Sequence, residues 1–380
     1  MRFSGADPFP ELSISRNKII MIHKNQEIIN SIIIPCYNIT SLVGKSLDSV
    51  LHQKNIRDCE IICVDDGSND TTLHVLNKYH EKYKKIITVI SNKTNHGVSD
   101  ARNQGLGAAR GRYVMFLDGD DTIGYNPVRP SAIDSTYLEK FARVMAQDSN
   151  IGMVIGGIVL TGEKEYQTYK TIDEFKTCKD LDKTLCLLDD RISSCATLYK
   201  NQIIKDCKLE FKPDLLYFED AHFITSYAFG MAQHKNTLAE VPNAFYLYYR
   251  RQGSAMYNLY NSSEQNMRRL ENVRNKIFYY SNLLMNVDKV LGDSSRIFRI
   301  SANKLAATRK YIYKYCIKPA PNTSSLFESF MQYIPQNCRG CVKPDCRTCA
   351  DEQIATGIKE SDTNLAILKR TAANTVKHLK

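Results

Sequence analysis

The chain contains one short apolar run that ends in three carboxylates: Tyr113-Val114-Met115-Phe116-Leu117-Asp118-Gly119-Asp120-Asp121. The apolar residues predict a buried β-strand, and the acidic residues predict the loop at its carboxyl end. Three carboxylates this close repel one another, and a cation between them would relieve the repulsion. Oxygen ligands at a strand end suit Mg²⁺ or Mn²⁺, which bind a few carboxylates together with substrate phosphates. The stretch therefore predicts a metal site, although an Asp-X-Asp without such neighbours would indicate only a solvated turn.

From residue 31 to this stretch, apolar strand-like runs alternate with segments that carry helix signals. The runs that begin at residues 31, 60, 86 and 113 predict strands, and the segments 42–53, 70–83 and 99–109 predict helices. This alternation indicates a doubly wound parallel sheet, in which ligands bind beyond the carboxyl ends of the strands. The polar residues expected together at that edge are Asn38, Asp65, Asp66, Asp118 and Asp120.

In the second half of the chain, Glu219 and Asp220 stand inside the aromatic run 216–223. Burial among aromatic side chains would raise the pKa of a carboxyl group toward the range useful to a general base. A helix N-terminus, where acidic residues are favourable, would explain the pair equally well. Further along, a tyrosine-rich strand near 245–249 ends in Arg250 and Arg251.

The composition is that of a globular protein of moderate size. With 380 residues and 43% apolar residues, the chain can form one large α/β domain and a smaller appendage. No apolar run approaches the roughly 18 residues that cross a bilayer, and the first ten residues lack the apolar centre of a signal peptide. Twelve cysteines without a secretory signal indicate reduced thiols or metal ligands. The expected location is cytoplasmic.

The net charge of +10 comes from the C-terminal third, where residues 261–380 hold 20 Lys and Arg against 10 Asp and Glu. Apolar residues at spacings of three and four predict amphipathic helices over 264–291 and 294–317. Such basic helices are expected to pack against the domain, with peripheral contact to an anionic membrane surface, such as the inner face of the plasma membrane, as a further expectation. No nucleic-acid partner is expected.

Two Cys-X-X-Cys pairs lie close together near the C-terminus. Four thiolates at this spacing predict a small structural zinc site, and two disulfides, an iron–sulfur cluster or free thiols are the alternatives. The four cysteines are Cys338, Cys341, Cys346 and Cys349.

Four motifs in order carry a resemblance to a known family: residues 34–38 (IPCYN), 64–70 (VDDGSND), 95–103 (NHGVSDARN) and 116–121 (FLDGDD). Together they resemble family 2 glycosyltransferases of the GT-A fold, tightly over 30–130 and more loosely to about residue 256. The resemblance implies transfer of a sugar from a nucleotide diphosphate donor, with a UDP-sugar favoured, and with inversion at the anomeric carbon. The implied acceptor is a hydroxyl of a glycan or a lipid-linked molecule in the synthesis of surface polysaccharides or glycoconjugates.

The resemblance assigns roles to the residues around the donor. Asp66, with Asp65 beside it, is expected to accept hydrogen bonds from the nucleobase, because a carboxylate only accepts. Arg102 is expected to support the diphosphate or the acidic loop. The other residues expected at the nucleotide sugar are Pro35 and Tyr37, which would wall the base, and Asn38, Asp118, Gly119 and Arg250, the last preferred to Arg251 for the diphosphate.

The resemblance also places the metal and the base. Asp118 and Asp120 are expected to hold Mn²⁺ or Mg²⁺, with Asp120 as the direct ligand. Asp220 is expected to be the general base that takes the proton of the attacking hydroxyl, with Glu219 as the alternative.

The expected organisation is a leader of uncertain order at 1–30, a GT-A domain at 31–258 and a basic helical extension at 259–380 that contains the cysteine cluster at 338–349. Within the domain, 31–130 would bind the nucleotide sugar and 131–258 the acceptor. The alternatives are a catalytically inactive nucleotide-binding relative and a nucleotidyltransferase. A nucleotidyltransferase would need a glycine-rich loop after the first strand, where this chain has residues 35–38 (PCYN).

Overall fold

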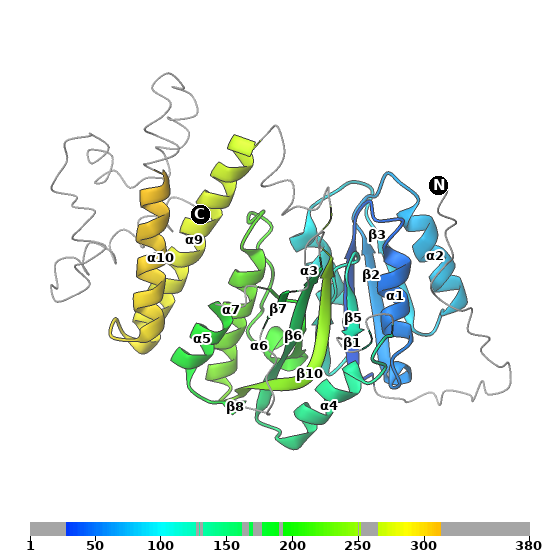
Figure 1. Cartoon of the computed structure of the whole chain (residues 1–380), viewed down its shortest axis with the longest axis horizontal. Helices are drawn as coiled ribbons and strands as arrows, with labels where there is room; N and C mark the ends of the chain where they lie inside the picture. The colour runs from blue at the N-terminus through cyan, green and yellow to red at the C-terminus, as the bar shows by residue number, and fades with distance from the viewer. Residues whose placement is uncertain are drawn as a thin grey trace.

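The computed structural model describes residues 28–126, 129, 132–161, 167–169, 177–189, 193–249, 251 and 265–312. Within these residues, ten strands form one mixed sheet with helices on both faces (Figure 1). The main path of the sheet runs β3-β2-β1-β4-β9-β6-β10-β5, while β7 pairs with β6 and β8 with β10. Most of the leader, Arg250 and the four clustered cysteines lie outside the described residues.

The first half of the sheet is parallel, as predicted. Its strands are β1 (Asn30–Cys36), β2 (Cys59–Asp65), β3 (Ile87–Ser91) and β4 (Tyr113–Phe116), and its helices are α1 (Val43–Leu51), α2 (Thr72–Lys82) and α3 (Val98–Ala108). Strands β2 and β4 both pair in parallel with β1, and every residue of β1 and β2 is buried. This burial explains their continuous apolar sequence, because a parallel strand is covered by helices on both faces.

The second half of the sheet is mixed. Strand β9 (Thr197–Lys200) runs antiparallel to both β4 and β6 (Ile151–Thr161), and β6 pairs in parallel with the long β10 (Thr237–Tyr249). The other elements here are η1 (Ile56–Asp58), β5 (Thr122–Tyr125), α4 (Tyr137–Gln147), β7 (Gln167–Tyr169), β8 (Thr177–Cys178), α5 (Leu181–Asp189), α6 (Asn201–Asp206) and α7 (Glu219–Gln233). Strand β5 follows the acidic stretch directly and pairs antiparallel with β10, which fixes both ends of that stretch in the sheet.

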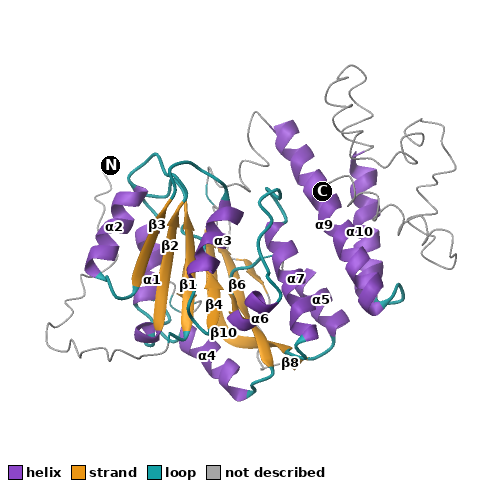
Figure 2. Ribbon diagram, turned by 180° about the vertical axis from the view of Figure 1, so that it is seen from behind, coloured by secondary structure: helices purple, strands orange, loops and turns teal. Residues whose placement is uncertain are grey.

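Two long helices, α9 (Gln265–Leu291) and α10 (Arg296–Ile312), pack beside α7 and α5 (Figure 2). Their buried side chains, among them Tyr280, Val287 and Ile297, belong to the same hydrophobic cluster as the strands of the sheet. The predicted amphipathic packing is therefore present. None of the helices in the described residues is long and apolar enough to cross a membrane.

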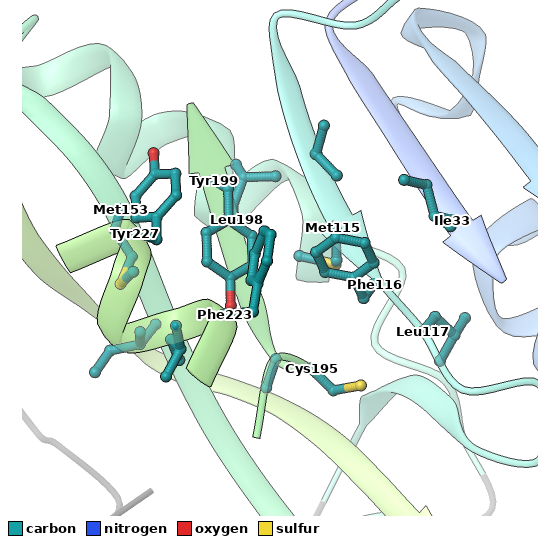
Figure 3. Packing of buried hydrophobic residues seen from close by; sticks show 14 of the residues in the cluster. Ile33, Met115, Phe116, Leu117, Met153, Cys195, Leu198, Tyr199, Phe223 and Tyr227 are labelled. Carbon is teal, nitrogen blue, oxygen red and sulfur yellow. The ribbon is translucent and has the colours of Figure 1, made fainter. Parts of the chain in front are cut away.

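An aromatic cluster joins the end of β4 to α7 (Figure 3). Phe116, the last residue of β4, packs edge-on against three rings. Its ring centroid lies 5.8 Å from that of Tyr199 in β9, 5.0 Å from that of Phe211 in the loop after α6, and 5.5 Å from that of Phe223 in α7. Edge-to-face pairs at these distances are favourable and orient the rings they join. The cluster fixes where the acidic loop after β4 lies relative to the first turn of α7.

Candidate active site

The acidic loop after β4 is a tight turn that lies against the end of β1. The Asp121 amide donates to the Asp118 carbonyl oxygen at 2.9 Å. A Cβ at Gly119 would lie 2.9 Å from the Pro35 carbonyl oxygen and 2.4 Å from Ile39 Cδ1. Only glycine permits this close approach, which holds the carboxylates beside the β1–α1 turn.

Asp121 anchors this loop to β10. Its carboxylate accepts hydrogen bonds from the Tyr246 hydroxyl at 2.7 Å and from the Tyr249 amide at 2.8 Å. The Asp118 amide in turn donates to the Tyr246 hydroxyl oxygen at 3.2 Å. Burial, together with the charges of Asp118 and Asp120, raises the pKa of Asp121 to about 9. Asp121 therefore fixes the loop, while Asp118 and Asp120 remain partly exposed.

Arg102 of α3 joins the acidic loop to the first turn of α7. Its guanidinium donates to Asp118 Oδ1 at 2.8 Å, to Glu219 Oε1 at 3.1 Å and to Asp220 Oδ1 at 2.9 Å. The side chain is only 3% exposed, so the bonds are formed away from bulk water. Arg102 therefore contacts the acidic loop, and its role in supporting that loop or a diphosphate stays a prediction.

Glu219 and Asp220 open α7, so the pair lies at a helix N-terminus, and Arg102 links both carboxylates to the acidic loop. The role of Asp220 or Glu219 as general base stays a prediction. Ser194 Oγ donates to Asp220 Oδ1 at 2.7 Å. Ser194 is in place because its neighbour Cys195 forms a parallel β-bridge with Phe116. Burial and the nearby Asp220 raise the pKa of Glu219 to about 7, against the opposing effect of Arg102.

Arg251 reaches the acidic loop from the end of β10. Its Nε atom donates to Asp120 Oδ2 at 2.8 Å. Burial and the Asp118 charge raise the pKa of Asp120, and Arg251 lowers it. The sequence ranked Arg250 above Arg251 for a role at the diphosphate. The structure places Arg251 at the site, and the preference for Arg250 stays a prediction.

At the other strand ends, the predicted base-binding residues form one edge with the acidic loop. Both oxygens of the buried Asp66 accept hydrogen bonds from the loop after β3: from Asn92 Nδ2 at 2.9 Å, the His96 amide at 3.0 and 3.1 Å and the Gly97 amide at 2.7 Å. Asn38 Oδ1 accepts from the Asn69 amide at 2.8 Å, and Tyr37 is 42% exposed. Asp66 and Asn38 therefore shape the loops here, while Tyr37 is partly exposed to solvent. Contacts of these residues with a nucleobase stay predictions.

The acidic loop carries two of the oxygen donors that a divalent cation needs. The described residues contain no group of three or more His, Cys, Asp or Glu side chains arranged to hold a metal ion. Asp118 and Asp120 nevertheless supply hard oxygen donors on one loop, and burial, followed by the charge of Asp118, raises the pKa of Asp120. Mg²⁺ and Mn²⁺ commonly bind one or two carboxylates and complete their shell with phosphates and water. The donor set therefore fits such an ion bound together with a diphosphate.

The chain matches the model of glycosyl transferase family 2 over residues 31–207. It is also 31% identical over 261 residues to an uncharacterized glycosyltransferase of Haemophilus influenzae, covering 66% of this chain and 74% of that protein. The chain belongs to glycosyl transferase family 2. As a member of this family it is a transferase enzyme, and the predicted recognition is confirmed.

Two further comparisons concern a shorter stretch of the sequence and the three-dimensional fold. Poly(ribitol-phosphate) beta-glucosyltransferase of Bacillus spizizenii is 41% identical over 95 residues, which are 25% of this chain and 15% of that protein. The structure of S. aureus TarS 1–349 in complex with UDP-GlcNAc superimposes with a TM-score of 0.57 at 16% identity, covering 92% of this chain and 89% of that one. This likeness confirms the predicted GT-A type α/β fold.

Proposed function

We propose that the enzyme transfers a sugar from a nucleotide diphosphate sugar, with a UDP-sugar favoured, to a hydroxyl group of a glycan or lipid-linked acceptor, with inversion. The observation that carries this proposal is the three-way contact of Arg102 with Asp118, Glu219 and Asp220. One guanidinium group bonds both to Asp118, on the donor side, and to the carboxylate pair Glu219 and Asp220, on the acceptor side. A displacement reaction needs its leaving group and its base on opposite sides of one carbon atom, and this spacing suits that need.

Known relatives support the donor and the biological setting. TarS has been solved with UDP-GlcNAc and with UDP, and relatives include GgaB of Bacillus subtilis, named as a minor teichoic acid biosynthesis protein. For the present enzyme we infer a UDP-sugar donor and a role in surface polysaccharide or glycoconjugate synthesis. A cytoplasmic location with peripheral contact to an anionic membrane belongs to the same proposal.

In the proposed reaction the acceptor oxygen attacks the anomeric carbon as the bond from that carbon to the diphosphate oxygen breaks. The hydroxyl proton passes to Asp220, and the electron pair of the broken bond stays on the diphosphate. Arg102 and Ser194 both donate to Oδ1 of Asp220, and within the described residues Oδ2 accepts no hydrogen bond, so we assign the proton to Oδ2. A single in-line displacement inverts the anomeric configuration. Glu219, with a pKa near 7, is the alternative acceptor of the proton.

On the donor side, Asp118 and Asp120 would hold Mn²⁺ or Mg²⁺. When bound, the ion would neutralise charge on the leaving diphosphate. Arg251, already at Asp120, adds a second positive charge beside the same leaving group. The zinc site proposed for Cys338, Cys341, Cys346 and Cys349 would be structural and separate from this chemistry.

The proposal is tested by release of nucleoside diphosphate from a panel of nucleotide sugars with Mn²⁺, with and without candidate acceptors. Asp220→Asn keeps the size of the side chain and removes its basic oxygen, so turnover is expected to fall by roughly 10² to 10⁴. Calorimetry with UDP and Mn²⁺ should show unchanged donor affinity in this variant. Near-normal turnover in Asp220→Asn, with Glu219→Gln inactive, would move the base to Glu219. Absence of turnover with every donor would refute the proposal.

A further inference from the structure

Asn275 of α9 lies behind the segment that leads into Glu219 and Asp220. Its side chain is buried, with 1% of the residue exposed. With the amide oriented to satisfy its neighbours, the side-chain oxygen accepts hydrogen bonds from the Leu216 and Tyr217 amides, both at 3.0 Å, and the side-chain nitrogen donates to Glu271 Oε1 at 3.2 Å. One side chain of the C-terminal helices therefore holds two consecutive peptide groups just ahead of the carboxylate pair.

The residue between this clamp and the pair has an unusual backbone. Phe218 adopts a left-handed conformation, with φ of 66°, immediately before α7 begins at Glu219. A bulky residue adopts this conformation only where its surroundings enforce it. Phe218 stacks on Tyr279 of α9, with ring centroids 5.6 Å apart, and meets the edge of Tyr280 at 6.4 Å. The same helix thus holds both the segment before Phe218 and the ring of Phe218.

Helix α9 is itself fixed to the catalytic half of the chain through α10. Asp182 of α5 accepts hydrogen bonds from the first amides of α10, Arg296 at 3.0 Å and Ile297 at 2.8 Å. The buried Asp189 at the end of α5 pairs with Lys304 of α10 at 2.5 Å. A helix pair anchored in this way can act as a rigid support for the start of α7.

We propose that Asn275 is a positioning residue for the proton acceptor, so that the C-terminal helices complete the acceptor side of the active site. This inference rests on the proposed role of Asp220. Arg102 and Ser194 hold the Asp220 carboxylate, but its backbone position depends on the segment that Asn275 fixes. Apart from the Arg102 contact, the acidic loop of the donor side has its own anchor, because Asp121 accepts hydrogen bonds from Tyr246 and Tyr249.

The experiment uses the full chain and three variants of the clamp. Asn275→Leu keeps a similar volume but cannot accept a hydrogen bond. Asn275→Asp keeps the oxygen that accepts from the Leu216 and Tyr217 amides, but it places a second carboxylate against Glu271. In the double variant Glu271→Gln with Asn275→Asp, the new glutamine amide can donate to the new aspartate, so the hydrogen bond between positions 271 and 275 is restored with donor and acceptor exchanged. Asn282→Leu is the matched control, since its amide donates to the carbonyl oxygen of Phe278 in the same helix, at 3.2 Å, and to no other group in the described part of the chain.

Asn275→Leu is expected to lower kcat by about 10²-fold, the cost of a small misplacement of a reacting group, with KM for the donor and UDP affinity unchanged. The pH profile of kcat should shift, because Glu219 and Asp220 lose their fixed relation to Arg102. The double variant should recover most of the lost kcat, and Asn282→Leu should match the wild type. Hydrogen exchange should become faster over residues 214–222 in Asn275→Leu alone.

Wild-type kcat and pH profile in Asn275→Leu would overturn the inference while leaving the proposed function intact, provided that Asp220→Asn is inactive. Equal losses of kcat, donor affinity and thermal stability without recovery in the double variant would also overturn it, because they indicate general destabilisation. If the wild type shows no turnover, the proposed function fails. Unchanged hydrogen exchange over 214–222 in Asn275→Leu would then overturn the clamp itself.

Discussion

Arg251 and Asp120 form an ion pair at the end of the sheet, with 2.8 Å between Nε and Oδ2, although the two residues are 131 positions apart in the chain. The pair places a protein cation on the carboxylate that is proposed to bind a divalent metal ion. We therefore expect the proposed metal ion to compete with Arg251 for Asp120, unless a bound diphosphate gives Arg251 a new partner.

This competition should give two variants opposite effects on the affinity for Mn²⁺ alone, which Asp120→Ala should lower and Arg251→Gln should raise. Asp120→Ala should abolish metal-dependent binding of UDP, because it removes the proposed direct ligand. Arg251→Gln should strengthen the binding of Mn²⁺ alone, because it frees Asp120, and weaken the binding of UDP with Mn²⁺, because it removes a cation from the diphosphate. Calorimetric titrations with Mn²⁺ alone and with UDP plus Mn²⁺ measure both effects. Equal Mn²⁺ affinity in all three proteins would rule out the metal at Asp120.

The first half of the sheet could be predicted from the sequence because each of its strands carries its own local signal. The β-branched run of β1 and the apolar run of β2 end in polar turns, as predicted, and the structure buries both strands fully. The mixed second half could not be predicted in the same way. The antiparallel pairing of β9 with β4, and of β5 with β10, depends on contacts between distant segments. No local pattern in those short strands specifies their partners.

In the candidate site too, some residues carry a local sequence signal, whereas others depend on contacts between distant segments. Asp118, Glu219 and Asp220 could be identified from the sequence because carboxylates next to apolar runs are conspicuous. Ser194 could not, since its role depends on the bridge between Cys195 and Phe116. The hydrogen bonds of Asp66 to the His96 and Gly97 amides join residues about 30 positions apart, and no sequence pattern reports them.

Two glycines provide a matched test of the acidic loop. Gly119→Ala would place a Cβ against the Pro35 carbonyl oxygen and should displace the loop, lowering turnover and metal-dependent UDP affinity together. Gly107 lies near the end of α3, where an added Cβ meets nothing within 4 Å. Gly107→Ala should therefore raise the free energy of unfolding by about 0.5–1 kcal/mol, with activity unchanged. Wild-type activity in Gly119→Ala would show that the loop tolerates displacement.

Glu219 should make stability depend on pH. Its pKa rises from the ordinary 4.5 to about 7 in the folded protein, so the folded state binds more protons than the unfolded state between these values. Stability should fall as the pH rises from about 4.5 to about 7 and then level off, with a contribution of up to about 3 kcal/mol. Glu219→Gln removes the titrating group while leaving an oxygen for Arg102. Urea denaturation at pH 5 and pH 7.5 should show a smaller loss of stability in Glu219→Gln than in the wild type.

Arg102 should be needed for both stability and turnover, and the two effects can be separated. Arg102→Gln leaves Asp118, Glu219 and Asp220 close together without their shared cation, which should lower the free energy of unfolding by about 3–5 kcal/mol. Arg102→Lys keeps the charge, but a single ammonium group lacks the planar fork that reaches three carboxylates. Arg102→Lys should therefore retain more stability than Arg102→Gln while losing a similar share of kcat. Equal kcat in Arg102→Lys and the wild type would show that charge alone, and not the geometry of the guanidinium, joins the donor side to the acceptor side.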